Sequence, residues 1–533
     1  MAGCGGKQVR RAVGGLLLLF ALVGSALVCS LESWADSRDV LVVATADSEF
    51  EMDPALAIST NSRRVLYCVY ETLVRPGARP GEVVPWLAQS WKCDKDGKVW
   101  TFTLRQGVSF HDGTPLSADK AADSIKRIWG ISSVGNRGGG ALQRTLLGER
   151  GRSLLEKVEV LSPLELRLTL RKPLADLLEI LSHPAFSIAW VSSRREDGTP
   201  VLQGTGPYLV EDCRRGQRLT LRRFERYWHH YPTWSRILLR TIRSASQRAV
   251  EVERDHVDMA WSLCGSCLQN LRAGESCSLV KHPGQVYWRL ALNCAQPPFS
   301  DIRCRFGVQR GIPTDLLLER CLAKDGCLAS CCLPPTSWAV AHSLTKRAYD
   351  PDKARSWYSK GVGKKPQEGL AQVELLYNAQ ACLDERVVHV VQELVSNLQN
   401  MGVNACGVGV SEREYRSRLA TGFYQMALLQ TEQGDCDPDI NLSMQWSGGD
   451  EMDGLVSIEN YSSERLWLAL NEARTTDDIE ARRRAYARAF GLVQEGAPEL
   501  PLAWVPVYSA YNAQIKGVKV DRFNMFDISE ASF

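Results

Sequence analysis

The sequence predicts an α/β protein with more than one sheet and more than one domain. Its 533 residues exceed a single domain, because domains average roughly 150 residues. Segments with helical spacing alternate with segments that read as strands, and no internal repeat of fixed period is visible. Hydrophobic residues make up 44% and charged residues 23%, a globular composition that excludes collagen-like, coiled-coil and wholly disordered chains.

The individual elements follow from apolar periodicity and from turn residues. Short apolar or alternating runs predict strands at 40–44, 100–104, 158–161, 164–170, 286–293, 403–410, 424–430 and 500–508. Apolar stripes of helical period predict helices at 62–73, 384–401 and 479–493, and a further helix beginning at Ser117. The Ser117 hydroxyl is expected to cap that helix, and Gly402 suits the left-handed residue that follows a helix end.

An apolar run from Ala12 to Leu31 predicts that the chain is exported. Basic residues precede the run and small residues follow it, and Ser33 and Ala35 suit a cleavage that removes residues 1–35 as a signal peptide. Two alternatives stay open: a lipoprotein anchored through Cys29, although the residue before this cysteine is larger than usual, or an uncleaved anchor. Charges interrupt every later apolar stretch, which excludes a polytopic membrane protein.

The net charge of the chain predicts no strongly charged binding partner. The formal net charge is +3, and the leader contributes three basic residues and one acidic residue, so the mature chain carries about +1. A charge this small produces no field that would attract nucleic acid or anionic lipid, and neither is expected as a partner.

Cysteine is abundant, with 17 residues, two of which lie in the leader. Cys264 and Cys267 form a CxxC pair that fits three interpretations: a redox pair, a zinc site or structural cysteines. The surroundings lack a thioredoxin-like unit, and no second CxxC or suitably spaced His pair completes a zinc site. We favour structural cysteines, with disulfides expected within 264–277 and among Cys321, Cys327, Cys331 and Cys332; the connectivity does not follow from the sequence.

Searches for catalytic and metal-binding motifs predict no enzyme, no cofactor and no metal. The sequence contains no HExxH helix, no Gly-x-Ser-x-Gly elbow and no Walker loop. Residues 435–439 space three carboxylates like a calcium loop, but Ile440 occupies the position where that loop needs glycine. His229 and His230 are adjacent, and adjacent side chains of an extended segment point to opposite sides, so a shared metal is not expected.

One long stretch carries a family resemblance. Residues 87–91 read Leu-Ala-Gln-Ser-Trp, and residues 100–119 read Trp-Thr-Phe-Thr-Leu-Arg-Gln-Gly-Val-Ser-Phe-His-Asp-Gly-Thr-Pro-Leu-Ser-Ala-Asp. This stretch resembles the signature of the extracellular solute-binding proteins of family 5, the peptide type, which feed ABC importers. Further similar segments follow in the family's order at 204–208 (Gly-Thr-Gly-Pro-Tyr), 224–228, 293–303, 349–354 and 500–508. The chain departs from the family pattern at Gly311-Ile312-Pro313-Thr314, where an Ala-Ile-Asp-Arg motif is usual, and in its cysteine content.

The resemblance implies a two-lobed, periplasmic-binding-protein-like fold with an inserted subdomain and two hinge crossings, near 286–293 and 500–508. The implied division is lobe I at 36–77, 201–292 and 504–533, the inserted subdomain at 78–200, and lobe II at 293–503. By the same resemblance the protein is a monomeric periplasmic receptor, in which a peptide ligand favours the closed lobes that a membrane permease recognises.

The resemblance also nominates site residues. Many family members pair a carboxylate with the α-ammonium of the peptide, and Asp435, in Gly434-Asp435 after the strand at 424–430, matches that position. Asp435 has a second interpretation, a loop carboxylate that caps its own turn. Peptide binders commonly carry Gly-Trp just before this loop, whereas this chain has Thr431-Glu432. If Glu432 faces the cleft, it adds negative charge, and together with Asp435 it would favour a cationic ligand; the alternative is a site for something other than an ordinary peptide.

Ser48 and Glu49 are further candidates, since they follow the first strand, where ligands approach open α/β sheets; their alternative interpretation is that of solvated loop residues. Other hypotheses stay open for the function. The same fold could bind a nickel chelate, haem, an opine or a sugar; an enzyme or redox protein would rest on the CxxC pair alone; and an envelope chaperone would use the fold without a small ligand.

Overall fold

The computed structural model describes residues 39–46, 50–57, 59–79, 81–129, 148–149, 152–214, 217–268, 271, 276–322, 326–340, 348–363, 372–380, 386–433, 438–446, 457–476 and 478–533. The predicted signal peptide and Cys29 lie outside these residues. Within them, no helix combines the length and the apolar character needed to cross a bilayer.

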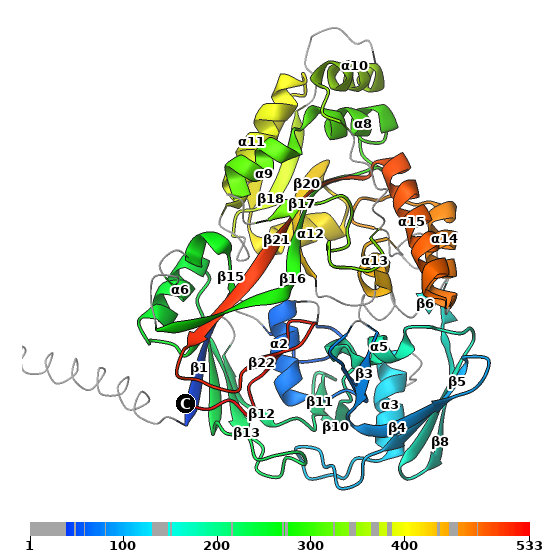
Figure 1. Ribbon diagram of the computed structural model, residues 1–533, viewed down its shortest axis with the longest axis vertical. Coiled ribbons are helices and arrows are strands. Elements are labelled where there is room, and N and C mark those ends of the chain that lie inside the picture. Colours follow the sequence, from blue (N-terminus) through cyan, green and yellow to red (C-terminus); the bar gives the residue numbers. More distant parts are fainter. Residues whose placement is uncertain are drawn as a thin grey trace, which may run out of the picture.

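A large mixed sheet of eleven strands runs through both lobes of the molecule (Figure 1). Across the sheet the strands are β12 (Tyr208–Arg214), β13 (Arg218–Arg223), β14 (Arg236–Thr241), β1 (Val40–Thr45), β15 (Met259–Leu263), β21 (Glu499–Asn512), β16 (Cys277–Leu292), β20 (Met426–Gln433), β18 (Val373–Asn378) and β19 (Ala405–Val410), and β17 (Cys327–Leu328) pairs with β21. We call the part around β12, β13, β14, β1 and β15 lobe I, and the part around β20, β18 and β19 lobe II.

Two long strands, β16 and β21, connect the lobes. The last residues of β21 pair with β15 of lobe I, whereas residues 285–292 of β16 pair with β20 of lobe II. The register between β16 and β21 shifts between Lys281 and Gln285, opposite 506–508. A bulge at this point increases local twist and bends the strands where the chain passes from one lobe to the other. Two strands thus connect the lobes, as the fold class predicts, and the irregularity in β16 lies before the expected range of 286–293.

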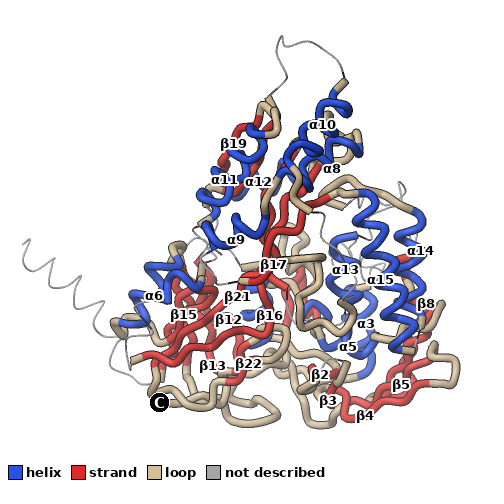
Figure 2. Tube along the Cα trace, turned by 45° about the horizontal axis from the view of Figure 1, so that its top comes forward, coloured by secondary structure: helices blue, strands red, loops and turns tan. Residues whose placement is uncertain are grey.

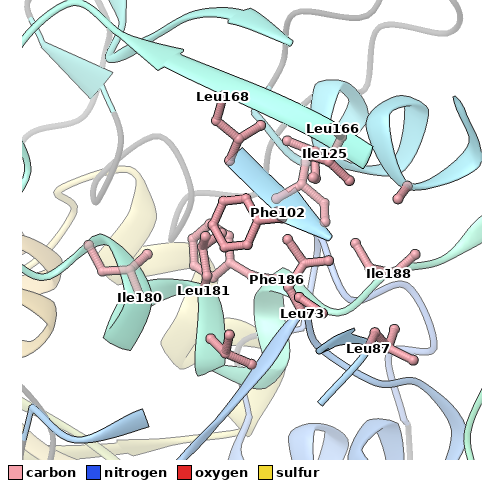
Figure 3. Packing of buried hydrophobic residues seen from close by; sticks show 14 of the residues in the cluster. Leu73, Leu87, Phe102, Ile125, Leu166, Leu168, Ile180, Leu181, Phe186 and Ile188 are labelled. Atoms are coloured by element: carbon pink, nitrogen blue, oxygen red, sulfur yellow. The ribbon is translucent and has the colours of Figure 1, made fainter. Parts of the chain in front are cut away.

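The inserted subdomain is built on a separate antiparallel sheet of four strands. In order these are β4 (Ala88–Cys93), β5 (Val99–Leu104), β9 (Glu165–Leu170) and β8 (Leu155–Ser162). Helices α3 (Ala118–Ile128) and α5 (Leu177–Ser182) cover the sheet, and Figure 3 shows the apolar core between them, with Phe102 from β5 facing Leu181 and Phe186. This core forms because every second residue of β5 and β9 is apolar.

Helices surround the sheet in both lobes (Figure 2). Lobe I carries α2 (Thr60–Val69) and α6 (Ala245–Glu253). Lobe II carries α8 (Ile302–Gly311), α9 (Thr314–Leu322), α10 (Pro351–Val362), α11 (Val387–Asn400), α12 (Glu412–Ala420), α13 (Pro438–Trp446), α14 (Glu464–Thr475) and α15 (Ile479–Gly496). Smaller elements are β2 (Val74–Pro76), β3 (Val83–Pro85), β6 (Gly148–Glu149), β7 (Arg152–Ser153), β10 (Trp190–Arg194), β11 (Pro200–Gln203), β22 (Lys519–Val520), β23 (Phe526–Asp527), η1 (Pro184–Phe186) and η2 (Gly265–Cys267).

The two most distinctive sequence segments meet in space. The backbone N–H of His111, in the long stretch at 100–119, donates to the carbonyl of Gly204 over 2.9 Å, and the His111 ring contacts the carbonyl of Gly206. A Cβ on Gly204 would lie 1.9 Å from the carbonyl oxygen of Val69, the last residue of α2. Only glycine therefore fits at position 204, where the turn packs against the end of this helix. The Gly-Thr-Gly-Pro-Tyr turn therefore joins the inserted subdomain to lobe I.

A buried carboxylate fixes the same region. Glu71, just after α2, is 2% exposed and accepts hydrogen bonds from Trp86, Thr205, Tyr227 and Trp228 at 2.6–2.9 Å. A buried charge with this many donors is stable, because each lone pair that lost water has gained a protein partner. Thr205 of the Gly-Thr-Gly-Pro-Tyr turn and the aromatic residues of the segment at 224–228 are thereby held against lobe I.

The elements predicted from sequence all have counterparts, with shifted ends. The helix predicted at 62–73 ends earlier, at Val69, and Gly402 has the expected positive φ, +87°. The expected cap was wrong, because the Ser117 hydroxyl accepts from Lys120 and not from a backbone amide of α3. The expected disulfides were also wrong: among the described residues no cysteine is bonded to another, and Cys277, Cys327 and Cys332 carry free thiols.

Candidate functional site

Two of the predicted site residues, Thr431 and Glu432, lie close to the end of strand β20 at the junction of the lobes. Their side chains leave opposite faces of the strand, as successive residues of a strand do. Asp435, Ser48 and Glu49 lie outside the described residues, so their roles stay predictions.

Glu432 of lobe II makes an ion pair with lobe I. A carboxylate oxygen lies 3.2 Å from Nη2 of Arg64 on α2, and the two side chains are 6% and 0% exposed. The side-chain amide of Asn524 also donates to this oxygen, over 3.4 Å. Glu432 therefore contacts lobe I through two donors and presents no uncompensated negative charge.

Arg64 is held in place by lobe I itself. Its guanidinium donates to the side chains of Asn61 and Ser262 and to the carbonyl of Asn524 at 2.8–3.0 Å. It also lies 5.5–5.6 Å from the ring centres of Trp261 and Phe526, a distance typical of cation–π contacts. These contacts orient the remaining N–H groups of Arg64 toward lobe II.

Backbone strain occurs at two of the residues that hold Arg64. Ser262 and Asn524 both have positive φ, +57° and +64°, a region that residues other than glycine rarely adopt. Such conformations cost about 1–3 kcal/mol each and persist where surrounding contacts impose them. Here the strain places a hydroxyl and a carbonyl against the guanidinium, which is consistent with a site shaped for this arginine.

Thr431 faces the interior of lobe II and contacts a buried charge cluster. Its hydroxyl accepts a hydrogen bond of 3.0 Å from Arg289 on β16. The Nε of Arg289 lies 3.2 Å from a carboxylate oxygen of Glu459 and 3.2 Å from one of Glu499. Burial raises the pKa of Glu499, Arg289 opposes this rise and Glu459 reinforces it. One arginine thus serves two buried carboxylates beside the predicted site.

A contact between lobe II and the inserted subdomain lies beside α13. The backbone N–H of Ala175, in the inserted subdomain, donates to the carbonyl of Arg474 at the end of α14. Arg474 in turn binds the fully buried carboxylate of Asp439, 3.0 Å away on α13. Asp439 is therefore paired, as Glu432 is, and these two carboxylates precede and follow Asp435 in the sequence.

Comparison with known proteins identifies the family. The family model of bacterial extracellular solute-binding proteins, family 5, middle, matches residues 82–453. The chain belongs to this family of solute-binding proteins of ABC importers. The resemblance and the fold class predicted from the sequence are thereby confirmed.

Relatives of this family 5 protein span nearly its whole length. The dipeptide-binding protein of Escherichia coli (strain K12) is 24% identical over 85% of this chain and 86% of its own, and the nickel-binding periplasmic protein of the same organism is 26% identical over 91% and 92%. A dipeptide-binding protein from Pseudoalteromonas sp. SM9913, solved in complex with Met-Leu, superposes with a TM-score of 0.82 at 20% identity, covering 92% of this chain and 99% of its own. Relatives with different ligands match equally well, so the comparisons fix the family and the fold but not the solute.

Sequence reasoning missed the basic partners in the site of this family 5 protein. Arg64 lies 368 positions before Glu432, and Arg289 lies 142 positions before Thr431. A signal did exist for Arg64, because it stands one turn before Cys68 on the buried side of α2, where an unpaired charge would be costly. No local sequence pattern predicts that Arg64 pairs with the carboxylate of Glu432.

His282 makes the stability of this family 5 protein sensitive to acid. It is 2% exposed on β16, its Nε2 lies 2.8 Å from the Ser509 hydroxyl of β21, and burial together with Arg64 lowers its pKa well below 6.5. Below about pH 6.5 the unfolded chain therefore binds a proton that the folded protein does not. The contribution of neutral His282 to the free energy of unfolding is therefore complete above this pH and decreases as the pH falls below it.

We expect His282→Gln, whose amide can still form a hydrogen bond with Ser509, to lose less stability than the wild type between pH 7.5 and pH 5 in urea unfolding. The exposed His256, replaced by glutamine, is the matched control and should leave the pH dependence unchanged. Equal losses in the wild type and in His282→Gln would contradict the assignment.

Proposed function

We propose that this protein is an exported receptor that captures short peptides between its two lobes and delivers them to an ABC import permease. In this proposal the α-ammonium of the peptide pairs with Asp435, and the peptide backbone binds in an extended form, which tolerates different side chains. Thr431, Glu432, Ser48 and Glu49 contribute to the surroundings of the ligand. The protein catalyses no reaction.

The pairing of the neighbouring carboxylates supports a ligand with one positive charge. Glu432 is bound by Arg64 and Asn524, and Asp439 is bound by Arg474. Neither of them therefore adds negative charge to the site, which removes the reason to expect a polycationic ligand. An α-ammonium is a single charge, and one carboxylate such as Asp435 balances it.

The topology of the sheet supports a role for Ser48 and Glu49 in ligand binding. They follow β1, which runs parallel to both of its neighbours, β14 and β15. Ligands of open α/β sheets bind beyond the carboxyl ends of parallel strands, and residue 45 is that end of β1.

Closure is proposed to depend on the contacts between the lobes. In the structure lobe II contacts lobe I through Glu432 and Arg64, and it contacts the inserted subdomain through Arg474 and Ala175. The bulge between Lys281 and Gln285 supplies a place at which β16 can bend. A ligand that contacts both lobes would favour this closed arrangement, because only the closed state offers all its binding energy.

Location, assembly and domain limits belong to the same proposal. We propose a periplasmic monomer that is released by cleavage after Ala35, with lipidation at Cys29 as the alternative. The division of the chain at 77/78, 200/201, 292/293 and 503/504 likewise stays a proposal.

Native mass spectrometry of the protein purified from its own cells, without added ligand, tests this proposal. We expect a set of bound masses that fit short peptides, and a marked loss of those masses in Asp435→Asn. Asp437→Asn, two positions away in the same loop, is the matched control and should retain them. The mass of the protein itself reports whether the chain begins after Ala35 or carries lipid on Cys29.

The other outcomes each contradict the peptide proposal. One bound mass that corresponds to a metal chelate, haem, an opine or a sugar would assign the protein to a different ligand. A protein that is empty and shows no thermal shift with peptide pools would favour a chaperone role. Peptide masses that persist equally in Asp435→Asn would keep the ligand class and reject the role of Asp435.

A further inference from the structure

Three potential metal ligands meet on lobe I, outside the junction of the lobes. They are His229 and His230, in the loop before β14, and Glu530, near the carboxyl terminus. One ligand atom from each residue lies within 4.8 Å of the other two. The chain bends at 228–229, so the two adjacent rings have centroids 5.2 Å apart. The extended geometry that argued against a shared metal is therefore not present.

The tautomer of His230 is set by a chain of hydrogen bonds. The hydroxyl of Ser529 donates to Asp527 over 2.7 Å, so its oxygen is left to accept from Nε2 of His230, 2.9 Å away. Nε2 therefore carries the proton and Nδ1 carries a lone pair. Metal-binding histidines are commonly oriented in this way, with the second nitrogen donating to an oxygen.

The lone pair of His230 faces a carboxylate. Nδ1 of His230 is buried without a hydrogen-bond partner and lies 3.6 Å from Oε1 of Glu530. Two acceptors at this distance repel each other unless a cation lies between or beside them. The other oxygen of Glu530 is bound by Lys519, 2.7 Å away, which leaves Oε1 directed at the histidines.

The loop that carries both histidines is rigidly supported. Tyr227 and Trp228, directly before them, both donate to the buried carboxylate of Glu71, as does Trp86. The His229 ring lies 4.9 Å from the ring of Trp86 and 5.1 Å from that of Trp228. A ligand set on a fixed scaffold loses little entropy on binding.

We propose that His229, His230 and Glu530 form a binding site for a late first-row divalent cation such as Zn²⁺. Two imidazole nitrogens and one carboxylate oxygen suit the borderline cations of this group, and water would complete the coordination. Metal–ligand distances of about 2.0–2.2 Å require side-chain shifts on the order of 1 Å, which the exposed His229 and Glu530 can make. The site is independent of the solute site and of the proposed function.

Calorimetric titration of the mature, untagged full-length protein with Zn²⁺ at pH 7.5 tests the site. Accessible thiols are first blocked with iodoacetamide, because thiolates also bind zinc. We expect one Zn²⁺ per chain, and at least tenfold weaker binding in His229→Gln, His230→Gln and Glu530→Gln. His256→Gln, an exposed histidine elsewhere on the chain, is the matched control and should bind as the wild type does.

Fluorescence gives an independent measure of the location. Cu²⁺ bound at this site should quench Trp86 and Trp228 in the wild type and not in His229→Gln, which keeps the fold because its side chain is exposed. The proposal is overturned if Zn²⁺ does not bind, or if it binds equally to the wild type and to the three site variants. Zinc bound elsewhere, including the solute site, would give that second result.

Discussion

Replacing Arg289 with methionine is expected to lower the free energy of unfolding by about 3–5 kcal/mol, because it leaves buried carboxylates without their cation. The side chains of Arg289, Glu459 and Glu499 are 4%, 0% and 2% exposed, so water cannot take over the role of the guanidinium. Urea unfolding at pH 7.5 measures the loss. Arg303→Met is the matched control: this arginine is 53% exposed beside Asp301, and its loss should cost at most about 1 kcal/mol.

Two further variants separate charge from packing at this cluster. If the cost arises from uncompensated charge, adding Glu459→Gln and Glu499→Gln to Arg289→Met should restore much of the lost stability. The single variant should also regain stability relative to the wild type as the pH is lowered from 7.5 to 5. Burial raises the pKa of Glu499, and without Arg289, which opposes this rise, Glu499 binds a proton in the folded state more readily. A loss that neither acid nor the two glutamines reduces would instead indicate that Arg289 acts through packing.

The family and the fold class could be predicted because the informative residues are local. The turn at 204–208 needs glycine where its backbone touches the end of α2, and the stretch at 100–119 forms a strand, a turn and a helix from neighbouring residues. Such requirements leave a recognisable pattern in one short segment. The alternation of strands and helices then fixed the α/β class.

Element ends and polar details were predicted less well, because they depend on tertiary neighbours. Ser117 has the residue type and position of a helix cap, yet its hydroxyl accepts from Lys120. The many cysteines of a chain that is predicted to be exported favour disulfides, but Cys332 lies 3.4 Å from the indole nitrogen of Trp446 and Cys277 lies near the carbonyl of Val252. Which partner a side chain meets follows from the packing of distant segments.

The candidate site could be located only in part. Thr431 and Glu432 were expected just after a strand that ends at residue 430, whereas β20 continues to Gln433 and includes both of them; their role at the ligand stays a prediction. Their partners Arg64 and Arg289 come from other parts of the chain and belong to no motif. Glu432 was therefore expected to add charge to the site, whereas its pairing with Arg64 makes it a contact between the lobes.

The contact between Glu432 and Arg64 leads to the second prediction, a large loss of ligand affinity. Glu432→Gln is expected to weaken ligand binding about 10- to 100-fold while leaving the stability of the separate lobes nearly unchanged. Glu432 meets Arg64 only when the lobes touch, and a hydrogen bond to a charged group contributes about 1.5–3 kcal/mol. Arg64 keeps Asn61, Ser262 and Asn524 as partners within lobe I in either arrangement, so its own lobe does not depend on Glu432.

The cost of Glu432→Gln therefore falls on the closed state alone, and the affinity of any ligand that requires closure decreases by the same factor. Small-angle scattering with a saturating and a limiting amount of the ligand identified by mass spectrometry should show a larger open fraction in the variant. Glu374→Gln, which removes a carboxylate paired with Arg418 within lobe II, is the matched control and should close normally. If Glu432→Gln binds and closes as the wild type does, the pair is a by-product of closure; if it unfolds more easily without ligand, Glu432 supports the fold and not the movement of the lobes.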